Sequence, residues 1–320
     1  MQKTIDTPTL AKRLRAERPE WSWNDCRRAI TAGRVLIDGK PAFDPAGRID
    51  SSQKLEIRTS GSKDLAPTKT KLDLKVYYSD EHIIVVEKPS GIESVPFATK
   101  TMFESSAKRL NDLTVIDLAR LFLEREERRK LPPLRVVHRL DKGTSGVMAF
   151  ARTRLAEREL ANLFRSHDIT RSYLAVCLGV PKSGIIQSTL VEDRGDGRRG
   201  STDWSGHRNT LGKKAITHVN VLETRNLSPH RALTLVTCRL ETGRTHQIRI
   251  HLAEAGHPLA GEKVYLTPSR EVDPVDDYSK SPRIALHAKE LGFKHPVSQK
   301  YIEWSSSLPD DLKRWWENLN

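Results

Sequence analysis

The chain has 320 residues and a mass of 36.3 kDa, enough for one large domain and one small domain. Hydrophobic residues make up 37% and charged residues 30% of the sequence, which is typical of a globular protein and excludes a disordered chain. The 54 Lys and Arg residues outnumber the 41 Asp and Glu residues, and the net charge of +13 makes nucleic acid the first partner to consider.

Apolar runs and cysteines indicate the compartment. Residues 1–6 contain no apolar signal region, and the run at residues 83–86 is far shorter than the roughly 18 residues of a membrane span. Cys26, Cys177 and Cys238 form neither a CxxC pair nor an even-numbered framework, so we interpret them as reduced. The sequence predicts a cytoplasmic protein with no membrane partner.

The first predicted unit is a small module of two helices followed by short strands. Ser22 and Asp25 have the S-x-x-D spacing of a capping box at the start of the second helix. The Asp38-Gly39 dipeptide predicts a tight hairpin turn between the strands. Residues 1–60 carry 12 basic and 8 acidic side chains, so the module is itself basic.

A second, larger unit follows a linker. We expect a first domain at residues 1–60, a linker rich in Ser, Lys, Thr and Pro at residues 61–71, and a second domain at residues 72–320. The second domain begins with a predicted β-hairpin and a helix capped by Thr114. Further strands are expected at residues 147–151, 173–178, 215–222 and 233–240, helices at residues 155–164 and 245–255, and long loops at residues 193–214 and 267–282. Hairpins without regular strand-helix-strand alternation predict an α+β fold with a mainly antiparallel, mixed sheet.

The first candidate functional run lies at residues 135–147. The turn from Gly143 to Gly146 holds Asp141 at a strand end, where a ligand can approach. Arg139 and Lys142 lie close to Asp141 in the sequence and favour its ionised form. An ionised carboxylate suits a nucleophile better than a general acid.

The second candidate run lies at residues 241–252, where a strand leads through a glycine turn into a helix. This pattern places Arg244, His246, Gln247 and Arg249 around a helix N-terminus, which favours phosphate or carboxylate partners.

A metal site is an alternative interpretation of the histidines in and after this run. His246, His251 and His257 are spaced by five and then six residues, which lacks the i, i+4 helical face of a zinc pair, and no Cys is near. We therefore expect no metal. A third run contains Tyr173, which taken alone is more typical of a half-buried strand aromatic than of a catalytic group.

Together these runs resemble the RluA-type branch of the pseudouridine synthases, which act on large-subunit ribosomal RNA and some transfer RNA. The most specific element is His138-Arg139-Leu140-Asp141 followed by Gly143-Thr144-Ser145-Gly146. Further matches are residues 242–249, His257-Pro258, Leu286-His287-Ala288 and His295-Pro296. The resemblance covers about residues 72–300 and implies an enzyme that detaches uracil from ribose, rotates it and rejoins it through carbon, with no cofactor.

The resemblance also implies roles for individual residues. Asp141 is expected to be the nucleophile, Arg249 its ion-pair partner, and Tyr173 a stacking partner of the target base that helps in proton transfer. Arg139 is expected to fill the space that the flipped nucleotide leaves, because flipping requires a few kcal/mol of unstacking. The residues expected to contact RNA in this domain are His138, Arg139, Arg244, His246 and Gln247.

The front module resembles the alpha-L RNA-binding motif of ribosomal proteins and RNA-modifying enzymes, in which the second helix and the following turn face RNA. The matching positions are Arg27, Arg28, Gly33, Arg34, Val35 and the Asp38-Gly39 turn. A solvated basic helix face is the alternative, but the complete helix-turn-strand order favours RNA binding.

Two departures from the family pattern concern the target. Residues 92–96 replace the usual continuation of Lys-Pro-x-Gly into Val-His-Pro, and Arg171 stands where lysine is usual. The sequence predicts a monomeric RNA pseudouridine synthase acting on large-subunit ribosomal RNA. The alternatives are a transfer-RNA pseudouridine synthase, a non-catalytic RNA-binding assembly factor, and a glycoside hydrolase, which normally needs two cooperating carboxylates.

Overall fold

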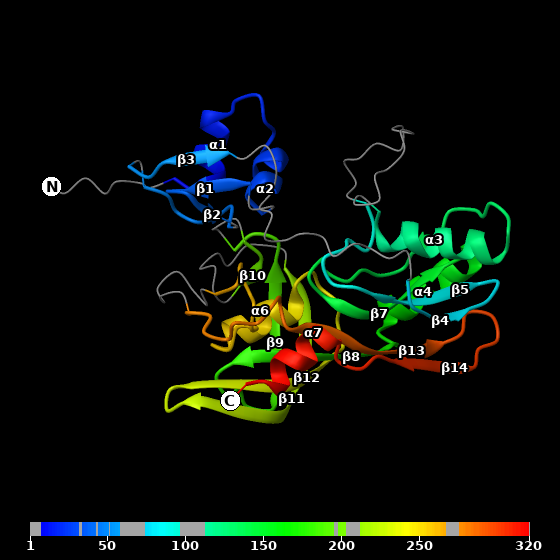
Figure 1. The fold of residues 1–320 in the computed structure, drawn as a ribbon. Helices are drawn as coiled ribbons and strands as arrows, with labels where there is room; N and C mark the ends of the chain where they lie inside the picture. Colours follow the sequence, from blue (N-terminus) through cyan, green and yellow to red (C-terminus); the bar gives the residue numbers. More distant parts are fainter. Residues whose placement is uncertain are drawn as a thin grey trace.

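The computed structural model describes residues 8–31, 34–42, 44–50, 52–57, 74–96, 113–194, 198–202, 212–266 and 275–319. Figure 1 shows two separate sheets, a small one near the N-terminus and a large one formed by the rest of the chain. The predicted linker at residues 61–71 and the predicted helix end at Gly33 lie outside the described residues.

The N-terminal module contains two helices and a three-stranded sheet. Its elements are α1 (Leu10–Glu17), α2 (Trp23–Thr31), β1 (Val35–Ile37), β2 (Lys40–Ala42) and β3 (Leu55–Ile57). The predicted capping box is confirmed, because the Asp25 N–H donates to Ser22 Oγ at 3.2 Å and the Ser22 N–H donates to the Asp25 carboxylate at 3.0 Å. Asp38 and Gly39 both have positive φ, at 48° and 77°, as the predicted hairpin turn requires.

The large sheet has eleven strands among the described residues. They are β4 (Val76–Ser79), β5 (Ile83–Lys88), β6 (Arg135–Val136), β7 (Ser145–Ala151), β8 (Thr170–Leu178), β9 (Gly184–Val191), β10 (Gly200–Ser201), β11 (Lys213–Ser228), β12 (Arg231–Leu240), β13 (Leu286–Lys294) and β14 (Tyr301–Ser305). The spatial order is β10-β9-β11-β12-β8-β13-β7-β5-β4, with β14 beside β13 and β6 beside β7. β13 and β7 pair in parallel and the other described pairs are antiparallel, so the predicted mainly antiparallel, mixed sheet is confirmed.

Four helices in the described part of this domain cover the sheet. They are α3 (Val115–Glu126), α4 (Arg154–Ser166), α6 (Gln247–Glu254) and α7 (Asp310–Glu317). Side chains alternate along β5, so that Ile84 packs with α3 and Ile83 packs with α4. Tyr173 of β8 packs against both the core cluster of α3 and that of α6, and therefore lies where the two halves of the domain meet.

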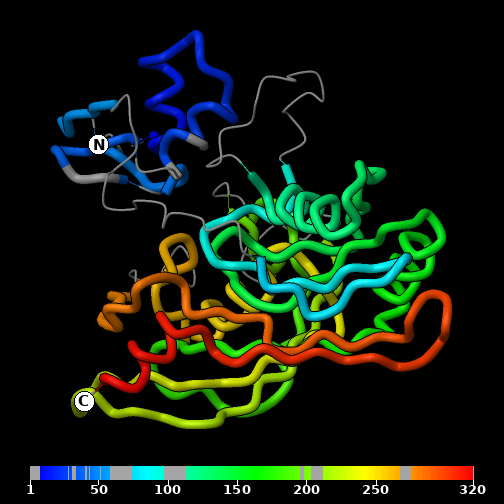
Figure 2. The backbone as a smooth tube through the Cα atoms, turned by 45° about the vertical axis from the view of Figure 1, so that its right-hand side comes forward, coloured from blue at the N-terminus to red at the C-terminus, as the bar shows by residue number. Residues whose placement is uncertain are grey.

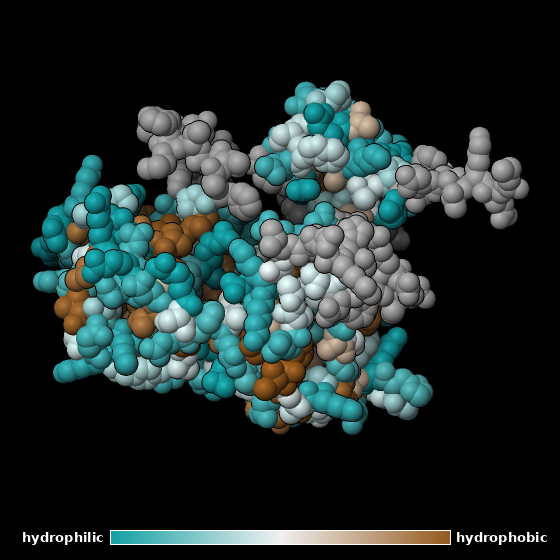
Figure 3. All heavy atoms as spheres, turned by 180° about the vertical axis from the view of Figure 1, so that it is seen from behind, coloured by the Kyte–Doolittle hydropathy of each residue, from teal (hydrophilic) through white to brown (hydrophobic). Residues whose placement is uncertain are grey.

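The C-terminal helix is held by the long β11–β12 hairpin, which Figure 2 shows running beside the end of the chain. Arg225 of this hairpin donates to the Trp316 carbonyl at 2.7 Å, and its guanidinium lies 4.8 Å from the Trp316 ring centroid. The surface in Figure 3 is mostly hydrophilic, with hydrophobic side chains in small groups. No helix of the described residues has the length and apolarity to cross a bilayer.

Several boundaries differ from the prediction. Helix α6 starts at Gln247 and not at residue 245, because His246 has the left-handed φ of 59° that ends the preceding turn. The segment 193–214 is not entirely loop, since β10 pairs with β9 and β11 begins at Lys213. Strands β9, β13 and β14 and helix α7 are not predicted from sequence. Residues 267–274 of the second predicted loop lie outside the described residues.

Candidate active site

Asp141 lies in the turn that leads into β7. Its carbonyl accepts the Thr144 N–H at 3.0 Å, and its side chain is 27% exposed. The turn is pressed against β13, because Gly146 has a φ of 119° and a Cβ there would overlap the backbone of Ala288. The carboxylate is therefore held on a tightly packed turn and remains accessible.

Lys88 contacts the backbone of this turn from the protein interior. The side chain is fully buried, and its Nζ donates to the carbonyls of Thr144 at 2.7 Å, Pro89 at 3.0 Å and Lys142 at 3.1 Å. Burial lowers the pKa of Lys88 to about 7, and the charge of Asp141 opposes this shift. Three carbonyl acceptors on one ammonium fix the backbone on the C-terminal side of Asp141.

Ser94 fixes the other side of the turn. Its Oγ donates to the Leu140 carbonyl at 2.8 Å and accepts the Leu140 N–H at 3.1 Å. Ser94 belongs to the segment that departs from the family pattern. The segment that differs from the family pattern therefore fixes the backbone next to Asp141 through Ser94.

Arg249 bridges two carboxylates. Its Nε and Nη2 each lie 2.7 Å from an oxygen of Glu262, and its Nη1 lies 3.6 Å from Asp141 Oδ2. Burial opposes the charge of Arg249, but the hydrogen bonds and charge of Glu262 and the charge of Asp141 raise its pKa above the ordinary value. The sequence-predicted pair of Asp141 and Arg249 is thus brought together, and Arg249 stays cationic.

Glu262 is a site residue that sequence reasoning missed. Its side chain is 1% exposed, and both oxygens accept from Arg249. Burial opposes ionisation, yet Arg249 and backbone N–H groups lower the pKa of Glu262 overall. Neither oxygen is open to a substrate, so this second carboxylate does not supply the acid–base pair of a glycoside hydrolase.

His246 and Tyr265 form the other wall beside Asp141. His246 Nε2 lies 3.8 Å from Asp141 Oδ2, and His246 Nδ1 lies 2.7 Å from the Tyr265 hydroxyl in a hydrogen bond. Burial and the charge of Arg249 lower the pKa of His246 to about 4, so the ring is neutral at neutral pH. A neutral imidazole next to Asp141 leaves Arg249 as its cationic partner. Tyr265 was also missed by sequence reasoning.

Tyr173 lies half-buried on β8. Burial raises its pKa to about 12, the charge of Arg171 opposes the shift, and the charge of Asp141 adds to it. The phenol therefore keeps its proton at neutral pH. The charge of Asp141, 32 residues earlier in the sequence, therefore acts on the Tyr173 phenol in the folded chain.

Gln247 lies inside the protein and not at the surface that its predicted role in RNA binding requires. Its amide is 2% exposed and makes four hydrogen bonds, donating to the Ile216 carbonyl and Thr217 Oγ1 and accepting from Thr242 Oγ1 and the Arg244 N–H. These bonds tie the start of α6 to β11. The physical reason is that every polar atom of the amide already has an internal partner.

His138 is also engaged internally. Its Nε2 accepts the Ala149 N–H at 3.0 Å, and its ring stacks on Phe164 at 4.7 Å between centroids. Burial and Arg171 lower the pKa of His138 to about 3, so the ring is neutral. Arg139, the next residue, is exposed.

The remaining predicted RNA contacts lie at the surface or in the N-terminal module. Arg244 is half-buried, and its Nε donates to the Lys214 carbonyl at 3.0 Å. Arg27 is exposed on α2, and the Arg34 guanidinium lies 6.0 Å from the Trp21 ring centroid. The side chain of Arg28 lies outside the described residues.

The histidines considered for a metal site make hydrogen bonds to different partners. His251 bonds to Ser188 and Thr217, and His257 bonds to the Leu178 carbonyl. In the described part of the chain, no group of three or more His, Cys, Asp or Glu residues could hold a metal ion.

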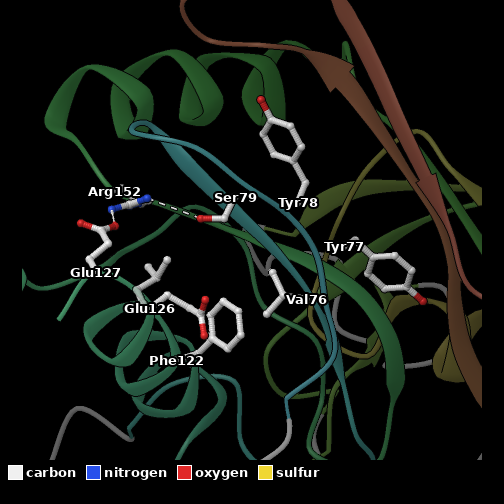
Figure 4. Close-up of a pocket in the computed structure, with 9 residues that line it drawn as sticks. Val76, Tyr77, Tyr78, Ser79, Phe122, Glu126, Glu127 and Arg152 are labelled. Atoms are coloured by element: carbon white, nitrogen blue, oxygen red, sulfur yellow. Dashed lines mark hydrogen bonds and ion pairs between the residues drawn. The ribbon is translucent and has the colours of Figure 1, made fainter.

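A hollow of about 460 Å³ lies elsewhere, between β4 and α3 (Figure 4). It is lined by Phe122, Glu126 and Glu127 of the α3 region and by Tyr78 of β4, with Arg152 paired to Glu127 at its edge. It contains none of the residues around Asp141. We therefore locate the active site by its chemistry and not by this hollow.

Comparisons with known proteins show the family to which the chain belongs. The model of the RNA pseudouridylate synthase family matches residues 82–254. Two relatives named ribosomal large subunit pseudouridine synthase D, from Neisseria meningitidis and Nitrosomonas europaea, are 34% and 36% identical over 92% of this chain, covering 74% and 79% of their own lengths. The uncharacterized RNA pseudouridine synthase YlyB of Bacillus subtilis is 31% identical over 96% of this chain and 93% of its own length.

Solved structures share the fold. Human RNA pseudouridylate synthase domain containing 4 has a TM-score of 0.58 and 22% identity, covering 77% of this chain and 92% of its own. Human RNA pseudouridylate synthase domain containing 1 has a TM-score of 0.55 and 24% identity, covering 73% and 83%. Fold and site together define an enzyme that modifies RNA. The chain belongs to the RNA pseudouridylate synthase family, in its RluA-type branch, and isomerises uridine to pseudouridine, as the sequence predicts.

Proposed function

We propose that this enzyme modifies uridines in large-subunit ribosomal RNA, that it acts in the cytoplasm as a monomer, and that Asp141 is its nucleophile. The ribosomal target is supported by the names of relatives that align with 92% of the chain. The observation that carries the mechanism is the accessible Asp141 carboxylate with the cation of Arg249 at 3.6 Å.

The reaction needs a group that binds one of the two fragments, ribose or uracil, while the uracil rotates relative to the ribose. Uridine and pseudouridine are isomers, so the bond between C1′ and N1 breaks, a bond between C1′ and C5 forms, N1 gains a proton and C5 loses one. Asp141 supplies the carboxylate that forms the covalent intermediate. Arg249 neutralises this carboxylate before the attack and when it leaves.

Tyr173 is placed to act on the base. Its protonated phenol lies at the junction of the α3 and α6 clusters, within reach of the charge of Asp141. We assign it stacking on the uracil and a part in the proton exchange. Arg139 is exposed next to the catalytic turn, which supports its role in replacing the flipped nucleotide.

Five of the remaining predicted RNA contacts keep that role in the proposal. His246 lies 3.8 Å from Asp141 Oδ2, Arg244 precedes it by two residues and is half-buried, and Arg27 is exposed on α2. Arg28 and Arg34 belong to the same proposed RNA-binding module. Gln247 and His138 are assigned to positioning α6 and the catalytic run, because their polar atoms or rings are engaged internally.

Mapping pseudouridines across ribosomal and transfer RNA tests the proposal. The comparison uses cells without the gene, complemented with the wild type, with Asp141→Asn, or with the control Asp168→Asn, whose side chain is exposed. We expect one or more positions in large-subunit ribosomal RNA to lose pseudouridine, and to regain it with the wild type and the control only. Loss confined to transfer RNA would contradict the target, and rescue by Asp141→Asn would contradict the nucleophile.

A further inference from the structure

A short segment between β9 and β11 lies against the helix that carries Arg249. We call residues 198–202 the β10 segment. β10 pairs with the end of β9, and the Ser201 N–H donates to Glu254 Oε1 of α6 at 2.8 Å. Leu190 of β9, Ile250 of α6 and Tyr265 pack in one core cluster. The β10 segment is therefore fixed to the same framework as the wall beside Asp141.

Two arginines begin this segment. Arg199 Nη1 lies 3.4 Å from Glu192 Oε1, and the Glu192 side chain is 87% exposed. Arg198 pairs with Asp44 of the N-terminal module, and its side chain is 14% exposed. The two consecutive arginines therefore face different neighbours.

Both arginines lie within electrostatic reach of the catalytic wall. Burial lowers the pKa of His246 and raises that of Tyr265, and the charge of Arg199 has a smaller lowering effect on both. Burial lowers the pKa of Arg198, and Tyr265 and Glu262 oppose this shift. Figure 1 shows β10 on the side of the large domain that lies nearest the N-terminal module. The segment thus connects the proposed RNA-binding module, through Arg198 and Asp44, with helix α6, through Ser201 and Glu254.

The carboxylates that hold these arginines do not belong to the catalytic site. Glu262 is fully used by Arg249, so the β10 arginines draw on Glu192 and Asp44. A pair with a carboxylate as exposed as Glu192 contributes little to stability, because water screens the two charges. A phosphate offers a guanidinium the same planar pair of acceptor oxygens and replaces such a partner readily.

We propose that Arg199 and Arg198 bind the RNA phosphates that flank the target uridine, exchanging Glu192 and Asp44 for phosphate oxygens. The backbone of the substrate then runs from the N-terminal module over the β10 segment to Asp141. This inference rests on the proposed function of the site, and it adds two residues to the RNA-binding surface that the motifs do not include.

The test measures turnover on total RNA from cells without the gene, labelled with tritium at C5 of uracil. The C5 hydrogen leaves when the new carbon bond forms, so released tritium reports the reaction. Arg199→Gln and Arg198→Gln should each raise the apparent KM about tenfold and leave kcat within about twofold, since a charge-assisted contact to bound substrate is lost. The slope of log KM against log salt should fall by about 1 in each variant.

Control variants separate this role from a structural one. Arg231→Gln removes an exposed arginine at the first position of β12 and should change neither KM nor the salt slope. Arg199→Lys should restore KM to within about threefold, because the ammonium still pairs with a phosphate. Asp44→Asn should leave KM at or below the wild-type value, since it removes a competitor for Arg198.

The opposite results overturn the inference. An unchanged KM and salt slope in both glutamine variants would show that neither arginine meets RNA. If Asp44→Asn raised KM as much as Arg198→Gln does, the Arg198–Asp44 pair would have a structural role between the two domains, and Arg198 would not bind phosphate. Tritium release confined to the transfer-RNA fraction would contradict the proposed ribosomal target, while the comparison of variants would still decide the phosphate contacts.

Discussion

Arg249 Nη1 lies 3.6 Å from Asp141 Oδ2, while the other edge of the same guanidinium is held at 2.7 Å by Glu262. The tighter pair fixes the arginine and the looser pair leaves Asp141 able to approach a substrate. Glu262 therefore acts through Arg249 and never reaches the reacting atoms. The two carboxylates that Arg249 joins thus differ in exposure, with Glu262 buried and Asp141 accessible for the proposed nucleophilic attack.

Glu262→Gln should uncouple the two pairs. The buried guanidinium loses its counter-charge, and breaking a buried ion pair costs about 3–5 kcal/mol of stability. We expect the free energy of unfolding in urea to fall by that order, and kcat to fall at least tenfold because Arg249 moves relative to Asp141. Glu317→Gln, at the exposed end of α7, is the control. An unchanged kcat would remove Glu262 from the positioning network.

Tyr173→Phe keeps the ring and removes the hydroxyl. Because burial holds the Tyr173 pKa near 12, the hydroxyl is protonated at neutral pH and can exchange a proton with the base. We expect kcat to fall by about 10²–10⁴ with little change in KM or stability. Tyr78→Phe, which removes a 3.0 Å hydrogen bond to Asp80 away from the site, should leave kcat unchanged. Equal rates for the two variants would limit Tyr173 to stacking.

Lys88→Met tests the clamp below the catalytic turn. The change removes three donors to backbone carbonyls, which destabilises the turn, and it removes a buried charge, which stabilises the fold. These effects oppose each other in the unfolding free energy but not in catalysis. We expect kcat to fall about 10²-fold, since a 1 Å misplacement of a nucleophile has that effect. A kcat within twofold of the wild type would show that the turn holds its shape without Lys88.

Stability should fall on mild acidification. Burial lowers the pKa of His251 and of His287 to about 4, against an ordinary value near 6.5. Between these values the unfolded chain takes up protons that the folded chain does not, so the free energy of unfolding falls as pH falls from 6.5 to 4. Each ring contributes up to about 3 kcal/mol over this window.

Urea unfolding at pH 7, 6 and 5 measures this slope above the range where most carboxylates titrate. His287 accepts from Ser145 and donates to the Ser306 carbonyl in its neutral form, so His287→Gln keeps polar atoms at the site without a titrating ring. The variant should show a shallower slope than the wild type. Parallel slopes would mean that folding does not lower the pKa of His287.

Local signals in the sequence predict much of this molecule. Capping pairs, the Asp38-Gly39 turn and apolar alternation depend on neighbouring residues, and they are confirmed. Strand β9 escapes prediction because its exposed Ile185 breaks the alternation that marks a half-buried strand. The region of strands β13 and β14 was interpreted from its motif residues and not from apolar patterning, so neither strand was predicted.

Site residues that belong to sequence motifs were predictable, and site residues that are defined only by tertiary contacts were not. Asp141 and Arg249 stand in recognisable runs, and the fold brings them together. Glu262 carries no local signal except that it is a lone acid after the apolar run 258–261, and its pairing with Arg249 exists only after folding. Gln247 shows the converse, because its burial is decided by β11, some 30 residues earlier in the chain.

The most direct test of the account is single-turnover tritium release by Asp141→Asn with saturating enzyme. Asparagine keeps the size and hydrogen-bonding capacity of the side chain and removes its nucleophilic charge. We predict a rate at least about 10³-fold below that of the wild type, with RNA affinity and unfolding free energy retained. A rate within tenfold of the wild type would contradict the assignment of Asp141 as the nucleophile.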